Sequence, residues 1–211
     1  MRRPLLAAVA ALALALPATT SLADGAKTPA PAAAKAALWE IDSAHTSAQF
    51  AVRHLMVSTV RGSFSKVSGT LEYDGKDLAT LKADVTIDVA SVNTGIEKRD
   101  EHLRSADFFD VAKFPTMTFK SKKAEKAGEG KFKLTGDLTI HGVTKEVTLE
   151  VEGPAPVVKD PWGNTKTGAT ATVKINRTDF GLKWNAVLEA GGVAVGEEVS
   201  ITIDIEAYQK K

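Results

Sequence analysis

The side chains with the widest chemical range in this sequence are its four histidines, at positions 45, 54, 102 and 141. No two of them are spaced as HxH or HxxxH, the spacings that place two imidazoles on one face of a strand or helix. His45 and His54 are nine residues apart, so they would face opposite sides of one regular strand. We therefore predict no metal site, and we interpret His45 and His141 as polar residues near turns or strand ends.

The densest group of chemically useful side chains is the run RDEHLR at residues 99–104, which leads into Phe108 and Phe109. Residues 97–109 are rich in helix formers, and acidic and basic side chains alternate along them at helical spacing. One interpretation is a short helix at the mouth of an apolar cavity, where Arg99 and His102 would meet a polar head group. The other is an amphipathic helix that only seals the end of the fold.

A second group is the run NRTDFGLKW at residues 176–184. Here Arg177 lies close in sequence to Phe180 and Trp184, so it could hold an anionic head group. It could equally form a structural ion pair with Asp179, and the sequence leaves both possibilities open.

Motifs of enzyme active sites are missing from the 211 residues. There is no G-x-S-x-G elbow and no P-loop, and the glycines at 191–196 do not fit a dinucleotide fingerprint. The absence of cysteine rules out disulfides, thiol nucleophiles and cysteine-type zinc sites. A formal net charge of +1 argues against a nucleic-acid partner. We expect a non-enzymatic protein without a cofactor and with no catalytic residues.

The elements that must position these groups are strands, because apolar and polar residues alternate with a period of two. Turn chemistry at 73–77, 126–130, 141–142 and 159–164 separates the alternating segments. Such patterning predicts an all-β fold of about eight antiparallel strands that curl on themselves, with one short helix at 97–109. The alternating segments are 48–52, 64–73, 81–89, 132–140, 147–151, 169–175 and 199–207.

The inward face of this expected barrel combines large apolar side chains with small ones such as Ala83, Ala169 and Ala171. Small residues either leave a ligand cavity or sit where the barrel tapers, and eight strands permit both arrangements. The residues that we predict to line a cavity are Phe50, Val52, Phe64, Leu71, Val85, Ile87, Phe119, Leu134, Leu138, Val173 and Ile201.

The N-terminal segment differs from the rest of the chain. Residues 1–23 combine a charged start, an unbroken apolar run at 5–16 and small residues before position 24, which is the three-part pattern of a secretory signal peptide. The run is too short for an ordinary membrane span. We predict cleavage after Ala23, a flexible Ala/Pro-rich tether at 24–37, a folded domain at 38–211 and a periplasmic location.

Several short segments together resemble the YceI family of bacterial polyisoprenoid-binding, lipocalin-like proteins. These segments are WEIDSAHT (39–46), FAVRHL (50–55), VRGSF (60–64), SVNTG (91–95), KRDEHLRSADFFD (98–110), GDLTIHGVTK (136–145) and NRTDFG (176–181). Each is weak alone, but their order and spacing are specific. The resemblance implies an extended antiparallel lipocalin-like barrel whose apolar cavity takes a long isoprenoid or fatty chain, in a secreted or periplasmic protein.

Three functions are compatible with these observations. The first is binding, sequestration or transport of a long-chain isoprenoid or related lipid, because each methylene group removed from water is worth about 0.8 kcal/mol. The second is an enzyme or accessory factor in isoprenoid quinone metabolism that uses Arg99 and His102. The third is a barrel with a filled interior. The expected partner is a lipid ligand, and the sequence is also compatible with a transient membrane contact and with a homodimer.

Overall fold

The computed structural model describes residues 36–189 and 191–210. The predicted signal peptide at 1–23 and most of the predicted tether at 24–37 lie outside these residues. The strands are β1 (Ala37–Ile41), β2 (Ser47–His54), β3 (Ser58–Phe64), β4 (Val67–Tyr73), β5 (Lys82–Asp88), β6 (Val92–Asn93), β7 (Thr116–Gly128), β8 (Lys131–Ile140), β9 (Val143–Glu152), β10 (Val158–Lys159), β11 (Thr165–Asn176) and β12 (Val195–Gln209). The helices are α1 (Glu97–Arg104) and the short 3-10 turns η1 (Leu78–Thr80), η2 (Val89–Ser91) and η3 (Arg177–Phe180).

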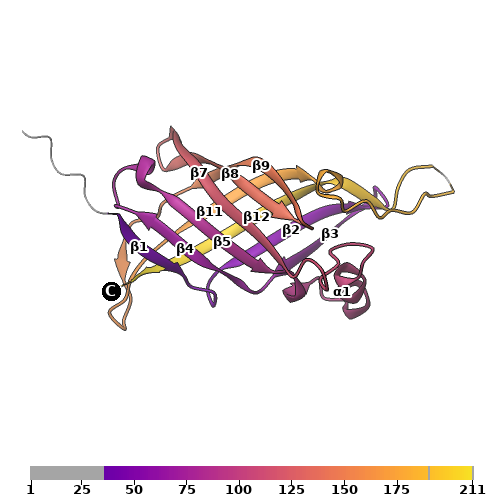
Figure 1. Cartoon of the computed structure of the whole chain (residues 1–211), viewed down its shortest axis with the longest axis horizontal. Coiled ribbons are helices and arrows are strands. Elements are labelled where there is room, and N and C mark those ends of the chain that lie inside the picture. The colour runs from indigo at the N-terminus through magenta and orange to yellow at the C-terminus, as the bar shows by residue number, and fades with distance from the viewer. Residues whose placement is uncertain (1–35, 190, 211) are drawn as a thin grey trace, which may run out of the picture. The chain divides into compact units, whose positions relative to one another are not determined.

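The sheet closes on itself as the alternation predicts (Figure 1). Neighbouring strands are antiparallel in the order β1, β4, β5, β7, β8, β9, β11, β12 and back to β1. The strands β2, β3 and β6 continue β1, β4 and β5 beyond short interruptions, and they pair with β12, β2 and β3 in turn. The fold is therefore a closed eight-stranded antiparallel barrel, which leaves no long unpaired edge.

Strand irregularities explain where the alternation is weak. No alternating segment predicted β7, because a register shift between Ser121 and Lys123 reverses the inward parity in mid-strand. Met117 and Phe119 point inward before the shift, whereas Ala124 packs against the core after it. The segment 64–73 crosses the break between β3 and β4. The predicted helix at 97–109 begins as expected but ends at Arg104, where Ser105 takes an extended conformation.

The core is one layer of apolar side chains on the inner wall of the barrel. Two of its aromatic rings lie directly over glycines of the neighbouring strand. A Cβ atom on Gly62 would lie 2.5 Å from the Phe50 ring, and one on Gly136 would lie 2.6 Å from the Phe119 ring. Glycine at these positions therefore makes room for a ring inside the barrel.

The two ends of the barrel carry different elements (Figure 1). One end, called here the helix end, carries α1, the turn between β2 and β3 and the segment that joins η3 to β12. The other, called the termini end, carries the start of β1, the β10–β11 hairpin and the end of β12. Within the described residues, no helix has the length and apolar character needed to cross a membrane.

Candidate functional site

The barrel encloses a cavity with a volume of about 240 Å³. Its lining is aliphatic and aromatic almost throughout, and it includes residues of both barrel ends. At the termini end it reaches Trp39, Tyr73 and Ala207, and at the helix end it reaches Phe108 and Val195. Every fully buried side-chain nitrogen or oxygen of the described residues has a hydrogen-bond partner, so none of them is left needing a ligand.

The cavity is narrow for its length. Along β12 alone its lining runs from Val195 to Ala207, which is about 40 Å of strand at roughly 3.3 Å per residue. The volume lies below the range of about 300–1,000 Å³ that is usual for compact small-molecule pockets. A thin, extended molecule matches this space better than a compact ring system does.

All eleven apolar residues that were predicted to line a cavity line this one. They are Phe50, Val52, Phe64, Leu71, Val85, Ile87, Phe119, Leu134, Leu138, Val173 and Ile201. Whether they contact a ligand stays a prediction. Further lining residues follow the same parity and were within reach of the sequence pattern, among them Ala171, Ile203 and Ile205. Others, such as Leu103 and Phe108, come from α1 and the segment after it, where period two carries no information.

Arg177 lies at the helix end of the cavity and is 5% exposed. Its Nε donates to the carbonyl of Gly196 (2.9 Å), its Nη1 to those of Leu182 and Trp184, and its Nη2 to that of Val195 (3.2 Å). Burial lowers the pKa of its guanidinium, an effect that the charge of Glu197 opposes. The side chain therefore binds backbone carbonyls instead of forming an ion pair with Asp179.

This arrangement gives Arg177 a structural task. Its four hydrogen bonds fasten the segment between η3 and β12 across the helix end of the barrel. The pattern uses the planar fork of donors that arginine alone offers. It also leaves the positive charge of Arg177 beside the helix end of the cavity.

The run at 99–104 is also occupied by structural contacts. Arg99 donates from Nε to Oγ1 of Thr94 and from Nη2 to its carbonyl, at 2.8 and 2.9 Å. Asp100 is buried and accepts from the backbone N–H and the hydroxyl of the same Thr94. Arg104 donates to the carbonyls of Ala90 and Val92. Arg99 does not line the cavity, and these three side chains hold the chain that enters α1.

His102 lies outside the cavity as well. Its Nε2 is 2.9 Å from Oδ2 of Asp107, and its ring packs edge-on against Phe108 and Trp184 at 5.0 and 4.9 Å between centroids. The ring thereby links α1 to the segment that Arg177 fastens. The structure thus brings His102 and Arg177 to the same end of the barrel, with only Arg177 facing the cavity.

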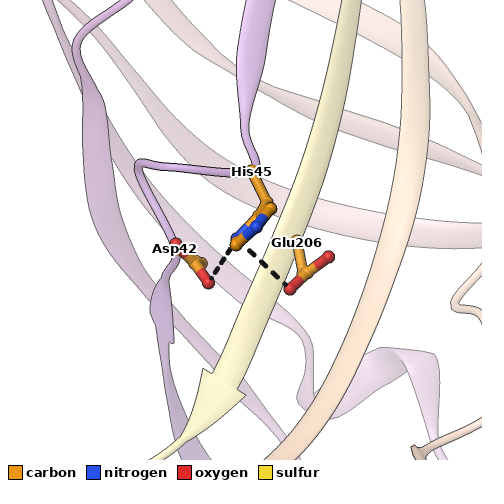
Figure 2. A group of neighbouring side chains, drawn as sticks. All are labelled: Asp42, His45 and Glu206. Atoms are coloured by element: carbon orange, nitrogen blue, oxygen red, sulfur yellow. Dashed lines mark hydrogen bonds and ion pairs between the residues drawn. The ribbon is translucent and has the colours of Figure 1, made fainter. Parts of the chain in front are cut away.

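A group of potential metal ligands that the sequence spacing did not predict lies at the termini end (Figure 2). Nδ1 of His45 is 2.9 Å from Oδ2 of Asp42 and 3.7 Å from Oε1 of Glu206. The same two carboxylate oxygens face Nζ of Lys166, at 3.0 and 2.6 Å. The lysine ammonium therefore already supplies the cation that two converging carboxylates require, and a metal ion would have to displace it.

The protonation of this cluster is strongly biased. The hydrogen bond from His45, followed by that from Lys166, lowers the pKa of Asp42 to about 2, although partial burial acts in the opposite direction. The hydrogen bonds to Glu206 and Asp42 raise the pKa of Lys166 above its ordinary value. The cluster is an ion-pair network that ties the loop after β1 to β11 and β12.

Comparison with known proteins agrees with this architecture. A UPF0312 protein of Staphylococcus aureus (strain MSSA476) is 43% identical over 166 residues, which cover 78% of this chain and 94% of that protein. The crystal structure of the Campylobacter jejuni YCEI protein has a TM-score of 0.64 and 38% identity, and the match covers 75% of this chain and 90% of that one. A polyisoprenoid binding domain from Saccharophagus degradans has a TM-score of 0.60 over 82% of this chain and 98% of its own; at 18% identity it supports the fold alone.

The sequence profile of the YceI-like domain matches residues 39–207. This range begins in β1 and ends in β12, so it spans the entire closed barrel and the elements at both of its ends. The segments that carried the resemblance in the sequence all lie within it. The chain belongs to the YceI family.

Proposed function

We propose that this protein binds the hydrocarbon chain of a long isoprenoid or a related lipid lengthwise inside the barrel, in the periplasm. The observation that carries the proposal is the narrow apolar cavity with lining residues at both ends of the barrel. The S. degradans domain with the same fold is described as polyisoprenoid binding, and this supports the ligand class by likeness of fold. The signal-peptide pattern at 1–23 supports the location.

The free energy gained when hydrocarbon leaves water favours binding of a long lipid chain in the cavity. Each methylene moved out of water gains about 0.8 kcal/mol, so affinity should rise with chain length until the cavity is filled. A lipid bilayer offers the same gain, and for that reason the cavity competes with the membrane by shape and not by greater apolarity. The protein therefore acts as a carrier or reservoir with reversible binding.

The position of Arg177 supports one orientation of the ligand. Arg177 places its positive charge beside the cavity at the helix end. Its guanidinium has five N–H groups, and four of them donate to backbone carbonyls, which leaves one on Nη2 for another acceptor. A phosphate or quinone carbonyl would be attracted to this end. We therefore place the polar head group at the helix end and the hydrocarbon tail toward Trp39.

A binding role is preferred to catalysis because the side chains of the enzyme hypothesis are engaged elsewhere. Arg99 is bonded to Thr94, and His102 is held by Asp107, Phe108 and Trp184. Neither lines the cavity in which a substrate would lie.

The test is native mass spectrometry of the protein purified gently from its own host, with two matched variants. Ala171 faces the cavity and is buried, whereas its neighbour Thr172 is exposed on the outer face of the same strand. We expect wild type and Thr172→Phe to carry the added mass of a long-chain lipid, and Ala171→Phe to lose most of it. A clean apo mass for all three proteins, or full lipid retention by Ala171→Phe, would contradict the proposal.

A further inference from the structure

Four aliphatic side chains are exposed together at the helix end; they are called here the apolar tip. The exposed fractions are 39% for Leu55, 55% for Met56, 77% for Val57 and 87% for Val187. The first three form the β2–β3 turn, and Val187 bridges to Val193 in the segment that leads into β12.

The two parts of the apolar tip are neighbours in space. The N–H of Leu55 donates to the carbonyl of Ala194 at 2.8 Å, and the N–H of Ala194 donates to the carbonyl of Ala186 at 2.9 Å. His54 also pairs with Val195, the first residue of β12. The β2–β3 turn and the hairpin around Val187 therefore project from the same end as one hydrogen-bonded unit.

The backbone conformation of the β2–β3 turn is unfavourable for the large side chains of Leu55 and Met56. Leu55 and Met56 have positive φ angles of 50° and 59°, and the N–H of Val57 donates to the carbonyl of His54. Two central residues with positive φ define the I′ type of turn, in which Asn-Gly is preferred. Large apolar residues there are strained as well as exposed. Folding stability therefore does not account for Leu55 and Met56, which indicates a role at a surface.

Cations lie behind the apolar tip. Arg53, Arg61 and Lys183 are exposed, and no ion pair of the described residues includes any of them. Nη2 of Arg53 donates to the carbonyl of Met56 at 2.6 Å and its Nη1 to Oγ1 of Thr59 at 3.2 Å, so the guanidinium lies beside the backbone of the turn.

Acidic side chains also lie nearby, Glu189 in the Val187 hairpin and Glu197 and Glu198 after Val195. Glu198 pairs with Lys174 and Glu197 accepts a hydrogen bond from Asn176, so these two are engaged away from the three cations.

We propose that the apolar tip docks this protein onto a lipid bilayer that contains anionic headgroups. Leu55, Met56, Val57 and Val187 enter the interface, while the cations behind them contact headgroup phosphates. Interfacial protein segments bury their apolar residues at the boundary of headgroups and acyl chains, with basic residues at the headgroup level. The guanidinium of Arg53, bonded to the turn backbone behind the apolar side chains, is placed for such a contact.

The position of the apolar tip matters for the ligand. Val52 and Val195, which line the cavity, are three and one residues away from Leu55 and Ala194 respectively. A docked protein would therefore present the helix end of its cavity to the bilayer. This last step rests on the proposed function, whereas docking itself requires no ligand.

Vesicle flotation tests the proposal, with the protein as purified from expressing cells and the same N terminus in every variant. The vesicles contain phosphatidylglycerol with phosphatidylcholine, or phosphatidylcholine alone. The decisive variant is Leu55→Asn with Met56→Gly, which removes apolar surface and supplies the preferred turn residues. We expect its partition coefficient to fall at least tenfold, while its unfolding temperature stays equal or rises.

The matched control is Trp162→Ser at the termini end, where the indole is 82% exposed. It should leave flotation unchanged. The pair Arg61→Gln and Lys183→Gln should weaken binding about fivefold per charge, with phosphatidylglycerol vesicles only. Unchanged flotation of the Asn-Gly variant, a loss caused by Trp162→Ser, or no binding of the wild type to anionic vesicles would overturn the proposal. Native mass spectrometry of the same samples reports lipid content separately, so failure of docking and failure of ligand binding are distinguishable.

Discussion

The two ends of the barrel use charged side chains in opposite ways. At the helix end, Arg177, Arg99 and Arg104 donate mainly to backbone carbonyls, and each fixes a loop over the barrel mouth. At the termini end, Lys166 is paired with the carboxylates of Asp42 and Glu206. Guanidinium groups bound to carbonyls do not titrate in the physiological range, whereas carboxylates titrate in acid. The contacts of Arg177 therefore depend on hydrogen-bond geometry, whereas the Lys166 network depends on pH.

The largest effect should come from removing the buried guanidinium. Arg177→Leu leaves several carbonyls without donors, and we expect the free energy of unfolding to fall by about 3–5 kcal/mol. Denaturant unfolding measures it. Arg61→Leu, the same change at an exposed arginine, should cost less than about 0.5 kcal/mol. Equal effects of the two substitutions would show that the carbonyl contacts contribute little.

The next largest effect is the pH dependence of folding stability that the Lys166 network at the termini end contributes. The folded pKa of Asp42 is about 2, below its ordinary value of 3.8, so its stabilisation is complete above about pH 4 and is lost as the pH falls through 2. Asp42→Asn should remove at most about 2 kcal/mol at neutral pH and flatten the acid dependence.

The control for the pH experiment lies at the other end. Arg177→Leu should keep the acid dependence of the wild type, although its stability is lower at every pH. Acid unfolding curves that are identical for wild type and Asp42→Asn would place the titrating carboxylates elsewhere.

The smallest effect concerns His102. His102→Ala removes two edge-on aromatic contacts and a partly exposed pair with Asp107, for an expected loss of about 1 kcal/mol. Thermal unfolding measures this loss, and native mass spectrometry should show undiminished lipid. Loss of bound lipid without loss of stability would contradict this account and indicate that His102 contacts the ligand.

The inner wall of the barrel could be predicted from the sequence because strand parity fixes the side that each residue faces. This placed residues as distant as Phe50 and Ile201 in one cavity, and they are paired across β2 and β12. Parity failed at β7, where the register shift after Ser121 exchanges the two faces. Such a shift depends on the neighbouring strand, so no pattern within one strand reveals it.

The roles of the polar residues could not be predicted from the sequence, because their partners are distant along the chain. Arg177 binds carbonyls of residues 182–196, which return to it only because the chain folds back into β12. The Lys166 network joins residues 124 positions apart, Asp42 and Lys166. A run of charged residues indicates that hydrogen bonds will form, whereas the fold decides whether the partners are a ligand, a carboxylate or the backbone.

Chain-length dependence of ligand binding tests the central claim most directly. Delipidated protein would be titrated with isoprenoid alcohols of increasing length, in competition with a bound fluorescent fatty-chain probe. A narrow, barrel-long cavity predicts that each added five-carbon unit strengthens binding, by up to about 4 kcal/mol, until the cavity is filled and the affinity levels off. Affinity that is independent of chain length from the shortest alcohol onward would contradict lengthwise binding in the barrel.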